Sequence, residues 1–154
     1  MKKLVLTVAA CLLASTAGAE TSWQVLTWSE EKVLLLDMDS KVKNGNKVFA
    51  WLAQVYADDQ RAYDLDVHGY EINCKNRTLS VEAVLYYKGG RLVNSDYSIN
   101  IKDFRIPPQS NGALYHKALC EPLKTHREIK IADMKQLTEF GRFFLFEANR
   151  LEKK

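Results

Sequence analysis

Alternating apolar and polar positions in the first two thirds of the chain predict a series of β-strands. Tyr70, Ile72 and Cys74 alternate with polar residues, so they share one side of an extended segment. Segments of this kind recur between short polar stretches. The predicted strands cover residues 23–28, 32–37, 47–56, 63–74, 77–87 and 92–97, with residues 99–104 as a further short edge strand.

Turn residues between these segments predict that neighbouring strands pair antiparallel. Asn44-Gly45-Asn46 and Gly89-Gly90 are typical of tight hairpins. Hairpin-sized connections favour a meander over parallel βαβ units. Residues 32–37 and 47–56 are apolar on both faces, which indicates strands that are covered on both sides.

Two segments follow a helical pattern instead. Ser110 is a candidate N-cap for a short helix over residues 113–120, and Pro122 ends it. A longer helix begins near Ala132, and its apolar residues recur every three or four positions: Met134, Leu137, Phe140, Phe144, Ala148 and Leu151. This stripe needs a surface, which is the free face of the sheet, a partner subunit or a membrane surface.

The pattern therefore predicts an α+β fold. It consists of a six-stranded antiparallel meander sheet, a short helix and an additional C-terminal amphipathic helix. We place the main domain at residues 20–122, and a basic linker with the C-terminal helix at residues 123–154.

The first nineteen residues have the features of an export signal. Lys2 and Lys3 precede an apolar run, and Ala17-Gly18-Ala19 is typical of a signal-peptidase site. An alternative is lipoprotein processing at Cys11. Removal of the two lysines lowers the formal net charge from +3 to +1, which gives no support to nucleic-acid binding. No later segment is apolar enough to be an integral membrane span.

Export makes the two remaining cysteines informative. Cysteines in an oxidising compartment usually pair, so we expect a disulfide between Cys74 and Cys120 that ties the short helix to the sheet. The competing interpretation is a metal site. His116 and Cys120 are four positions apart on the predicted helix, but only His68, Cys74 and His126 remain as further ligands.

The chain carries no motif of a known catalytic site or cofactor site, so we expect neither an enzyme nor a bound cofactor. Aromatic residues and arginines instead suggest binding surfaces, because these residue types are common at recognition sites. Two groups are candidates, although some members could equally be core or edge residues: Tyr86, Tyr87, Arg91 and Tyr97, and separately Arg61, Tyr63 and His68.

The order of several weak motifs resembles a known family. Trp23, Asp37-x-Asp39-Ser40 and Asn44-Gly45-Asn46 come first. They are followed by Trp51, Tyr70-Glu71-Ile72-Asn73-Cys74-x-x-Arg77, Tyr87, Gly89 and Pro108-x-Ser110-x-Gly112, and the series ends at Cys120. Together they resemble the surface-adhesin protein E family of small exported bacterial proteins. The resemblance implies an antiparallel sheet joined to a helix by a disulfide, and adhesins that bind host matrix or serum proteins. Dimers are known in that family.

Two hypotheses on function follow. The first is a non-enzymatic exported binding protein of the bacterial envelope, located in the periplasm, secreted or displayed on the surface. Its partner would be a host matrix protein or an envelope protein, with a homodimer as a further option. The alternative is a soluble periplasmic protein that docks into an envelope complex through its C-terminal helix.

Overall fold

The computed structural model describes residues 20–58, 60–122 and 128–152. The predicted signal peptide, with Cys11, and the linker residue His126 lie outside this part of the chain. The described residues form the elements β1 (Thr21–Trp28), β2 (Lys32–Asp37), β3 (Val42–Asn44), β4 (Lys47–Tyr56), β5 (Leu65–Asn73), β6 (Thr78–Lys88), β7 (Arg91–Asp96), β8 (Ile101–Arg105), α1 (Asn111–Cys120), β9 (Glu128–Ile131) and α2 (Met134–Glu152).

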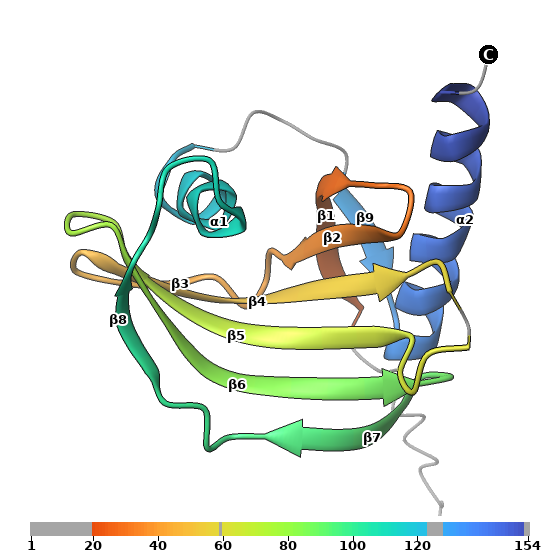
Figure 1. Cartoon of the computed structure of the whole chain (residues 1–154), viewed down its shortest axis with the longest axis horizontal. Helices are drawn as coiled ribbons and strands as arrows, with labels where there is room; N and C mark the ends of the chain where they lie inside the picture. Colours follow the sequence, from red (N-terminus) through yellow and green to blue (C-terminus); the bar gives the residue numbers. More distant parts are fainter. Residues whose placement is uncertain (1–19, 59, 123–127, 153–154) are drawn as a thin grey trace, which may run out of the picture.

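The strands form one antiparallel sheet in the order β7-β6-β5-β4-β2-β1-β9, with β3 paired to β4 and β8 paired to β6 (Figure 1). The predicted α+β fold and the meander of its six main strands are therefore confirmed. The structure adds three short strands to that meander. One is β8, which falls on the expected edge segment, and the others are β3 and β9. Residues 128–131 were placed in a linker by the sequence, but as β9 they pair with β1.

The sheet curls around α1, so that α1 lies on the inner side of the curve and α2 on the opposite side (Figure 1). A register shift between Gly69 and Tyr70 interrupts the pairing of β5 with β6, and such bulges bend a strand. A Cβ at Gly69 would lie 3.1 Å from the ring of Trp51. Glycine at this position thus lets the Trp51 ring approach the backbone of β5 closely.

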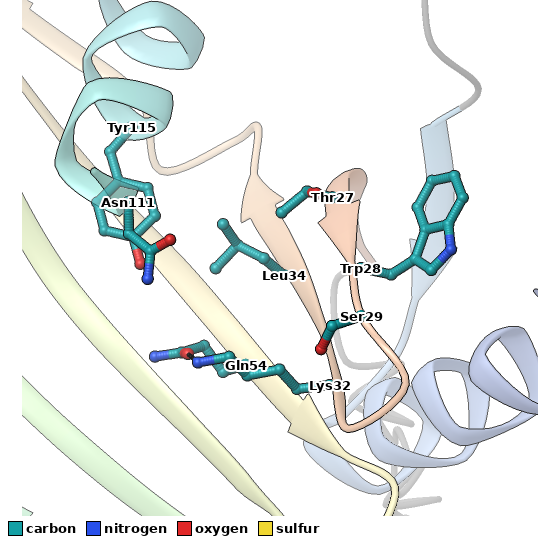
Figure 2. A pocket seen from close by; sticks show the side chains of 8 residues that line it. All are labelled: Thr27, Trp28, Ser29, Lys32, Leu34, Gln54, Asn111 and Tyr115. Atoms are coloured by element: carbon teal, nitrogen blue, oxygen red, sulfur yellow. Dashed lines mark hydrogen bonds between the residues drawn. The ribbon is translucent and has the colours of Figure 1, made fainter. Parts of the chain in front are cut away.

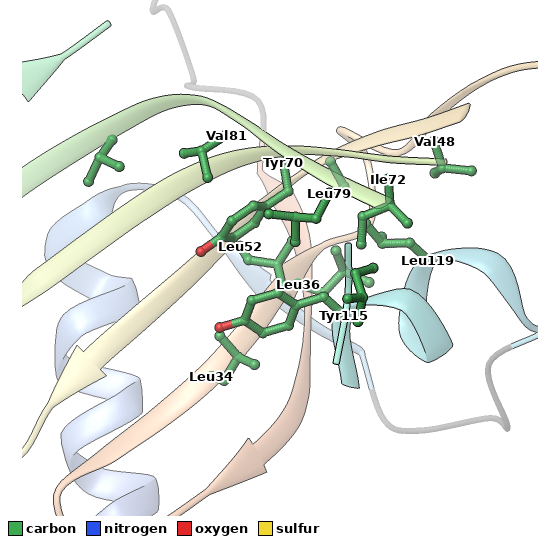
Figure 3. Packing of buried hydrophobic residues seen from close by; sticks show 13 residues of the cluster. Leu34, Leu36, Val48, Leu52, Tyr70, Ile72, Leu79, Val81, Tyr115 and Leu119 are labelled. Carbon is green, nitrogen blue, oxygen red and sulfur yellow. The ribbon is translucent and has the colours of Figure 1, made fainter. Parts of the chain in front are cut away.

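Each face of the sheet has its own hydrophobic core, because successive residues of a strand point to opposite sides. The core on the α1 side includes Leu34, Leu36, Leu52, Ile72 and Leu119, as Figure 3 shows. The core on the α2 side includes the residues that alternate with these along the same strands: Val33, Leu35, Ala53, Val55, Leu65 and Val67.

α1 is held at both of its ends. At its start, the Ser110 side chain accepts a hydrogen bond from the backbone N–H of Ala113 at 3.2 Å. At its end, Cys120 forms the predicted disulfide with Cys74, just after β5, with 5.6 Å between the Cα atoms. His116 Nε2 lies 3.2 Å from the carbonyl oxygen of Cys74. Because a carbonyl only accepts, this ring nitrogen is the donor.

α2 packs against the sheet of its own chain, which is the first of the three surfaces considered from the sequence. Leu137 and Leu145 are fully buried among the residues of the α2-side core. Gly141 lies directly over β4, and a Cβ at this position would stand only 2.7 Å from Val55. The absence of a side chain at Gly141 therefore sets how closely the helix approaches the sheet.

We expect the double substitution Cys74→Ser and Cys120→Ser to lower the free energy of unfolding by about 4 kcal/mol, because the disulfide restricts the unfolded chain. Urea denaturation of the oxidised protein and of the variant measures the difference. Wild type in a reducing agent should unfold like the variant. Equal stability of the oxidised and reduced protein would contradict a structural role for the bond.

We expect Gly141→Ala to lower the free energy of unfolding by about 1–3 kcal/mol, because the new methyl group collides with Val55. The matched control is Glu139→Ala, since that side chain is exposed on the same helix. Urea denaturation of both variants makes the comparison. A Gly141→Ala protein as stable as wild type would show that α2 does not rest on β4.

Candidate functional site

α1 covers only part of its face of the sheet, and the uncovered part is rich in polar and aromatic side chains. The paired strands place these side chains in a lateral row. Asp66 of β5 lies opposite Gln54 of β4 on one side and opposite Tyr86 of β6 on the other. We call this part of the α1 face the polar sector, which consists of Gln54, Tyr56, Asp66, His68 and Tyr86.

Asp66 is the centre of the polar sector. Its side chain is only 5% exposed, and its Oδ2 accepts a hydrogen bond of 2.7 Å from the Tyr56 hydroxyl. His68 Nε2 lies 3.1 Å from Oδ1. Oδ1 makes no hydrogen bond within the described part of the chain, so the approach of His68 is not a well-directed hydrogen bond. The ring of His68 also stacks on Tyr70, with 5.5 Å between centroids.

Gln54 connects this group to the strand at its side. Lys32 Nζ donates a hydrogen bond of 2.6 Å to Gln54 Oε1. The amide nitrogen of Gln54 lies 3.4 Å from His68 Nε2. A continuous set of polar contacts therefore crosses the sheet from Lys32 in β2 to Asp66 in β5.

An aromatic cluster adjoins the polar sector at the end of the sheet. The Arg61 guanidinium carbon lies 4.2 Å from the centroid of the Tyr56 ring, which is a cation–π contact. Tyr63 packs edge-on against Tyr56 at 5.7 Å and lies 4.9 Å from Tyr86. The loop between β4 and β5 thus folds back onto the sheet through its aromatic and arginine side chains.

The structure brings four of the seven candidate binding residues together and separates the other three. Arg61, Tyr63 and Tyr86 share the aromatic cluster, and His68 joins it through Asp66 and Tyr56. Tyr87 instead points to the opposite face, where it packs against the α2-side core. Arg91 and Tyr97 lie at the β7 edge, and Tyr97 is 69% exposed. A role in binding stays a prediction for all seven.

Sequence reasoning missed four members of the site, which are Lys32, Gln54, Tyr56 and Asp66. The alternation of Asp66 and His68 along a strand was the available signal, because it places both polar groups on one face. Their proximity to Gln54 depends on the pairing of β4 with β5, which the pattern of a single strand does not reveal.

Two openings lie on either side of the first turn of α1. One is a cavity of ≈ 190 Å³ between β2, β4 and α1. Figure 2 shows the side chains of Lys32 and Gln54 below Asn111 and Tyr115, with the Trp28 ring turned away from them. The other is a groove of ≈ 560 Å³ between α1 and β8, with walls of Tyr70, Leu79, Val81, Ile101, Phe104 and Ile106. Asn111 and Tyr115 line both openings.

The chemistry of the site is that of neutral hydroxyls beside a buried carboxylate. Burial raises the pKa of Tyr56, and its hydrogen bond to Asp66 raises that pKa further. Burial also raises the pKa of Tyr70. Both tyrosines therefore stay protonated at neutral pH. Residues 20–58, 60–122 and 128–152 contain no cluster of three or more His, Cys, Asp or Glu residues arranged to hold a metal ion.

Comparison with protein families identifies the family of this chain. A sequence profile described as Surface-adhesin protein E matches residues 23–121. The chain belongs to the surface-adhesin protein E family. The region that matches the adhesin family contains both disulfide cysteines and ends directly after α1, so β9 and α2 lie outside it. Comparisons with curated proteins and with solved structures return no match.

The family assignment supports an adhesin-like exported or surface protein, and it favours a non-enzymatic role. In the described part of this adhesin-family chain, no helix has both the length and the hydropathy needed to cross a bilayer.

We expect stability to fall above about pH 10, the ordinary pKa of tyrosine. Tyr70 keeps its proton in the folded state beyond the pH at which the unfolded chain loses it. Its contribution is therefore complete below about pH 10 and is lost as the pH rises toward the folded-state pKa. The loss for this one group is up to about 1.4 kcal/mol per pH unit.

Urea denaturation from pH 8 to pH 11 tests this expectation. Tyr70→Phe should show a shallower fall than wild type, whereas Tyr97→Phe should follow wild type because Tyr97 is exposed. Identical slopes for Tyr70→Phe and wild type would contradict the prediction.

Proposed function

We propose that this protein is a non-enzymatic exported binding protein of the bacterial envelope, with its ligand site at the β7 edge of the sheet. The observation that carries the proposal is a concentration of aromatic, apolar and arginine residues around the β6–β7 hairpin, all of them exposed except the half-buried Tyr63 and Tyr86. We call it the hairpin surface, and its members are Arg61, Tyr63, Tyr86, Arg91, Leu92, Val93 and Tyr97.

The hairpin surface has two properties of protein-binding sites. First, tyrosine and arginine are enriched among the residues that contribute most to binding energy. Second, β7 lies at the end of the sheet, with β6 as its neighbour, so its outer backbone groups face away from the sheet. An extended segment of a ligand can pair with such an edge, while its side chains contact Leu92 and Val93.

The surface is also held in place before any ligand binds. Lys88 Nζ donates a hydrogen bond of 2.9 Å to the carbonyl oxygen of Arg61, which links the hairpin to the neighbouring loop. Gly90 at the hairpin tip lies against the first turn of α2, where a Cβ would be 2.5 Å from Lys135. A pre-organised surface loses less conformational entropy on binding, which favours affinity.

The partner that we propose is a protein, either a host matrix or serum protein or another protein of the envelope. The family supports the first option, because adhesins act at the cell surface. Such a ligand requires export and surface display or secretion. A partner within the envelope would require only a periplasmic location. A second copy of the chain is a further candidate for the same edge.

A second candidate function rests on α2. Although α2 packs on its own sheet, Phe143, Phe146 and Leu151 remain exposed on its outer side. A cavity of ≈ 400 Å³ beside them is lined by Ala57, Arg142, Leu145, Phe146, Asn149 and Arg150. This surface suits a soluble periplasmic protein that docks into an envelope complex through its C-terminal helix.

Variants of the two surfaces test these functions. We expect Val93→Asp with Tyr97→Ala to weaken binding to a protein ligand at least about tenfold, which is the range of an interface hot spot. The ligand is first captured by the wild-type protein from immobilised matrix and serum proteins or from envelope extract. Surface plasmon resonance then compares the variants.

The matched control is Phe143→Asp with Phe146→Asp on α2. Loss of binding in the α2 variant alone would overturn the hairpin proposal in favour of the docking helix. Labelling of intact cells with a membrane-impermeant reagent adds the location. A protein that is labelled only after cell disruption would be inconsistent with an adhesin.

A further inference from the structure

The two openings beside α1 differ in chemistry although they meet at the same residues. The groove toward β8 is lined mainly by aliphatic and aromatic side chains. The cavity toward β2 contains an ammonium group and two side-chain amides, from Lys32, Gln54 and Asn111. Asn111 and Tyr115 line both, so a single ligand that passes the first turn of α1 would contact both environments.

The groove is suited to an apolar chain. Its volume of ≈ 560 Å³ falls within the range of small-molecule sites, which is about 300–1,000 Å³. Leu79, Val81 and Ile106 are buried in its walls, whereas Ile101 and Phe104 at its rim are 44% and 57% exposed. Covering these two side chains with an apolar ligand removes hydrophobic surface from water, which is favourable.

The cavity is suited to an anionic group. Lys32 Nζ uses one of its three protons in the hydrogen bond to Gln54 Oε1, so two remain for a ligand. None of the residues that line the cavity is acidic: Thr27, Trp28, Ser29, Lys32, Leu34, Gln54, Asn111 and Tyr115. The positive charge of Lys32 therefore has no carboxylate partner in the cavity wall. The Asn111 amide provides a further donor on the opposite side.

We propose that these openings form one binding site for a fatty acid. The acyl chain occupies the groove between α1 and β8, and the carboxylate lies in the cavity, where it accepts hydrogen bonds from Lys32 and Asn111. Charge complementarity selects this occupant over an uncharged lipid, because only an anionic head group pairs with Lys32. The site is separate from the hairpin surface, so the two proposals do not depend on each other.

Binding of laurate and of dodecanol to the purified protein tests the site, since the two share a chain and differ in the head group. Laurate is titrated below its micelle-forming concentration and dodecanol below its solubility limit, both against a displaceable fluorescent fatty acid. We expect laurate to bind saturably with one molecule per protein chain. Lys32→Met should weaken laurate binding about tenfold and leave dodecanol binding unchanged, because a charge-assisted hydrogen bond is lost. Phe104→Asp should weaken the binding of both ligands.

Two variants serve as matched controls, and both should bind laurate like wild type. Lys43→Met removes an exposed lysine of β3 that lines neither opening, and Leu92→Asp places a charge on an exposed apolar residue of the hairpin surface. Circular dichroism and thermal unfolding establish that each variant is folded. The proposal is overturned if laurate does not bind saturably, or if folded Lys32→Met binds laurate like wild type. If folded Phe104→Asp binds laurate like wild type, the groove does not hold the acyl chain. Binding of extended apolar peptides by the wild-type protein but not by Phe104→Asp would then assign the groove to a protein partner.

Discussion

The fold depends on one requirement, which is that both faces of the sheet must be covered. β2, β4 and β5 carry apolar side chains on alternate faces, so that Leu34 and Leu36 point one way while Val33 and Leu35 point the other. A sheet of this composition is stable in water only between two layers. α1 and α2 supply these layers, and each is attached by a different device.

The two devices reflect the different lengths of the helices. α2 has nineteen residues and a long apolar stripe, and Gly141 lets it approach β4 closely. α1 has ten residues, and its contact with the sheet is correspondingly small. An isolated helix of that length is marginal in water. The Cys74–Cys120 disulfide and the His116 contact to the Cys74 carbonyl oxygen therefore hold it on the sheet.

A short helix also leaves part of its face of the sheet uncovered, and this has consequences for function. Asp66, Tyr56 and His68 occupy that uncovered part, where the Tyr56 hydroxyl donates a hydrogen bond to Asp66 and His68 lies beside the same carboxyl group. The openings on both sides of α1 have the same origin. Because α2 covers the opposite face, the α1 side and the β7 edge are the parts of the sheet left open in this member of the surface-adhesin protein E family.

Local patterns were sufficient to predict the main elements of the fold, and the reason is physical. Alternation with a period of two and a stripe with a period of three to four are properties of single segments. Six strands and both helices could therefore be recognised, and the export signal made the pairing of Cys74 with Cys120 the expected outcome. The short strands β3 and β9 could not be recognised in the sequence, because strands of three and four residues carry too little pattern.

The candidate site, in contrast, depends on contacts between segments and could not be predicted from local patterns. Arg61 and Tyr63 meet Tyr86 only because the loop after β4 folds over paired strands. Asp66 meets Gln54 and Tyr86 through the register of β4, β5 and β6, and a slip of one residue would turn it to the opposite face. Periodicity along the chain was enough to predict the elements, and the export signal with two remaining cysteines was enough to predict the disulfide. The contacts between strands became evident only in the assembled sheet, because strand register and loop closure depend on residues far apart in the chain.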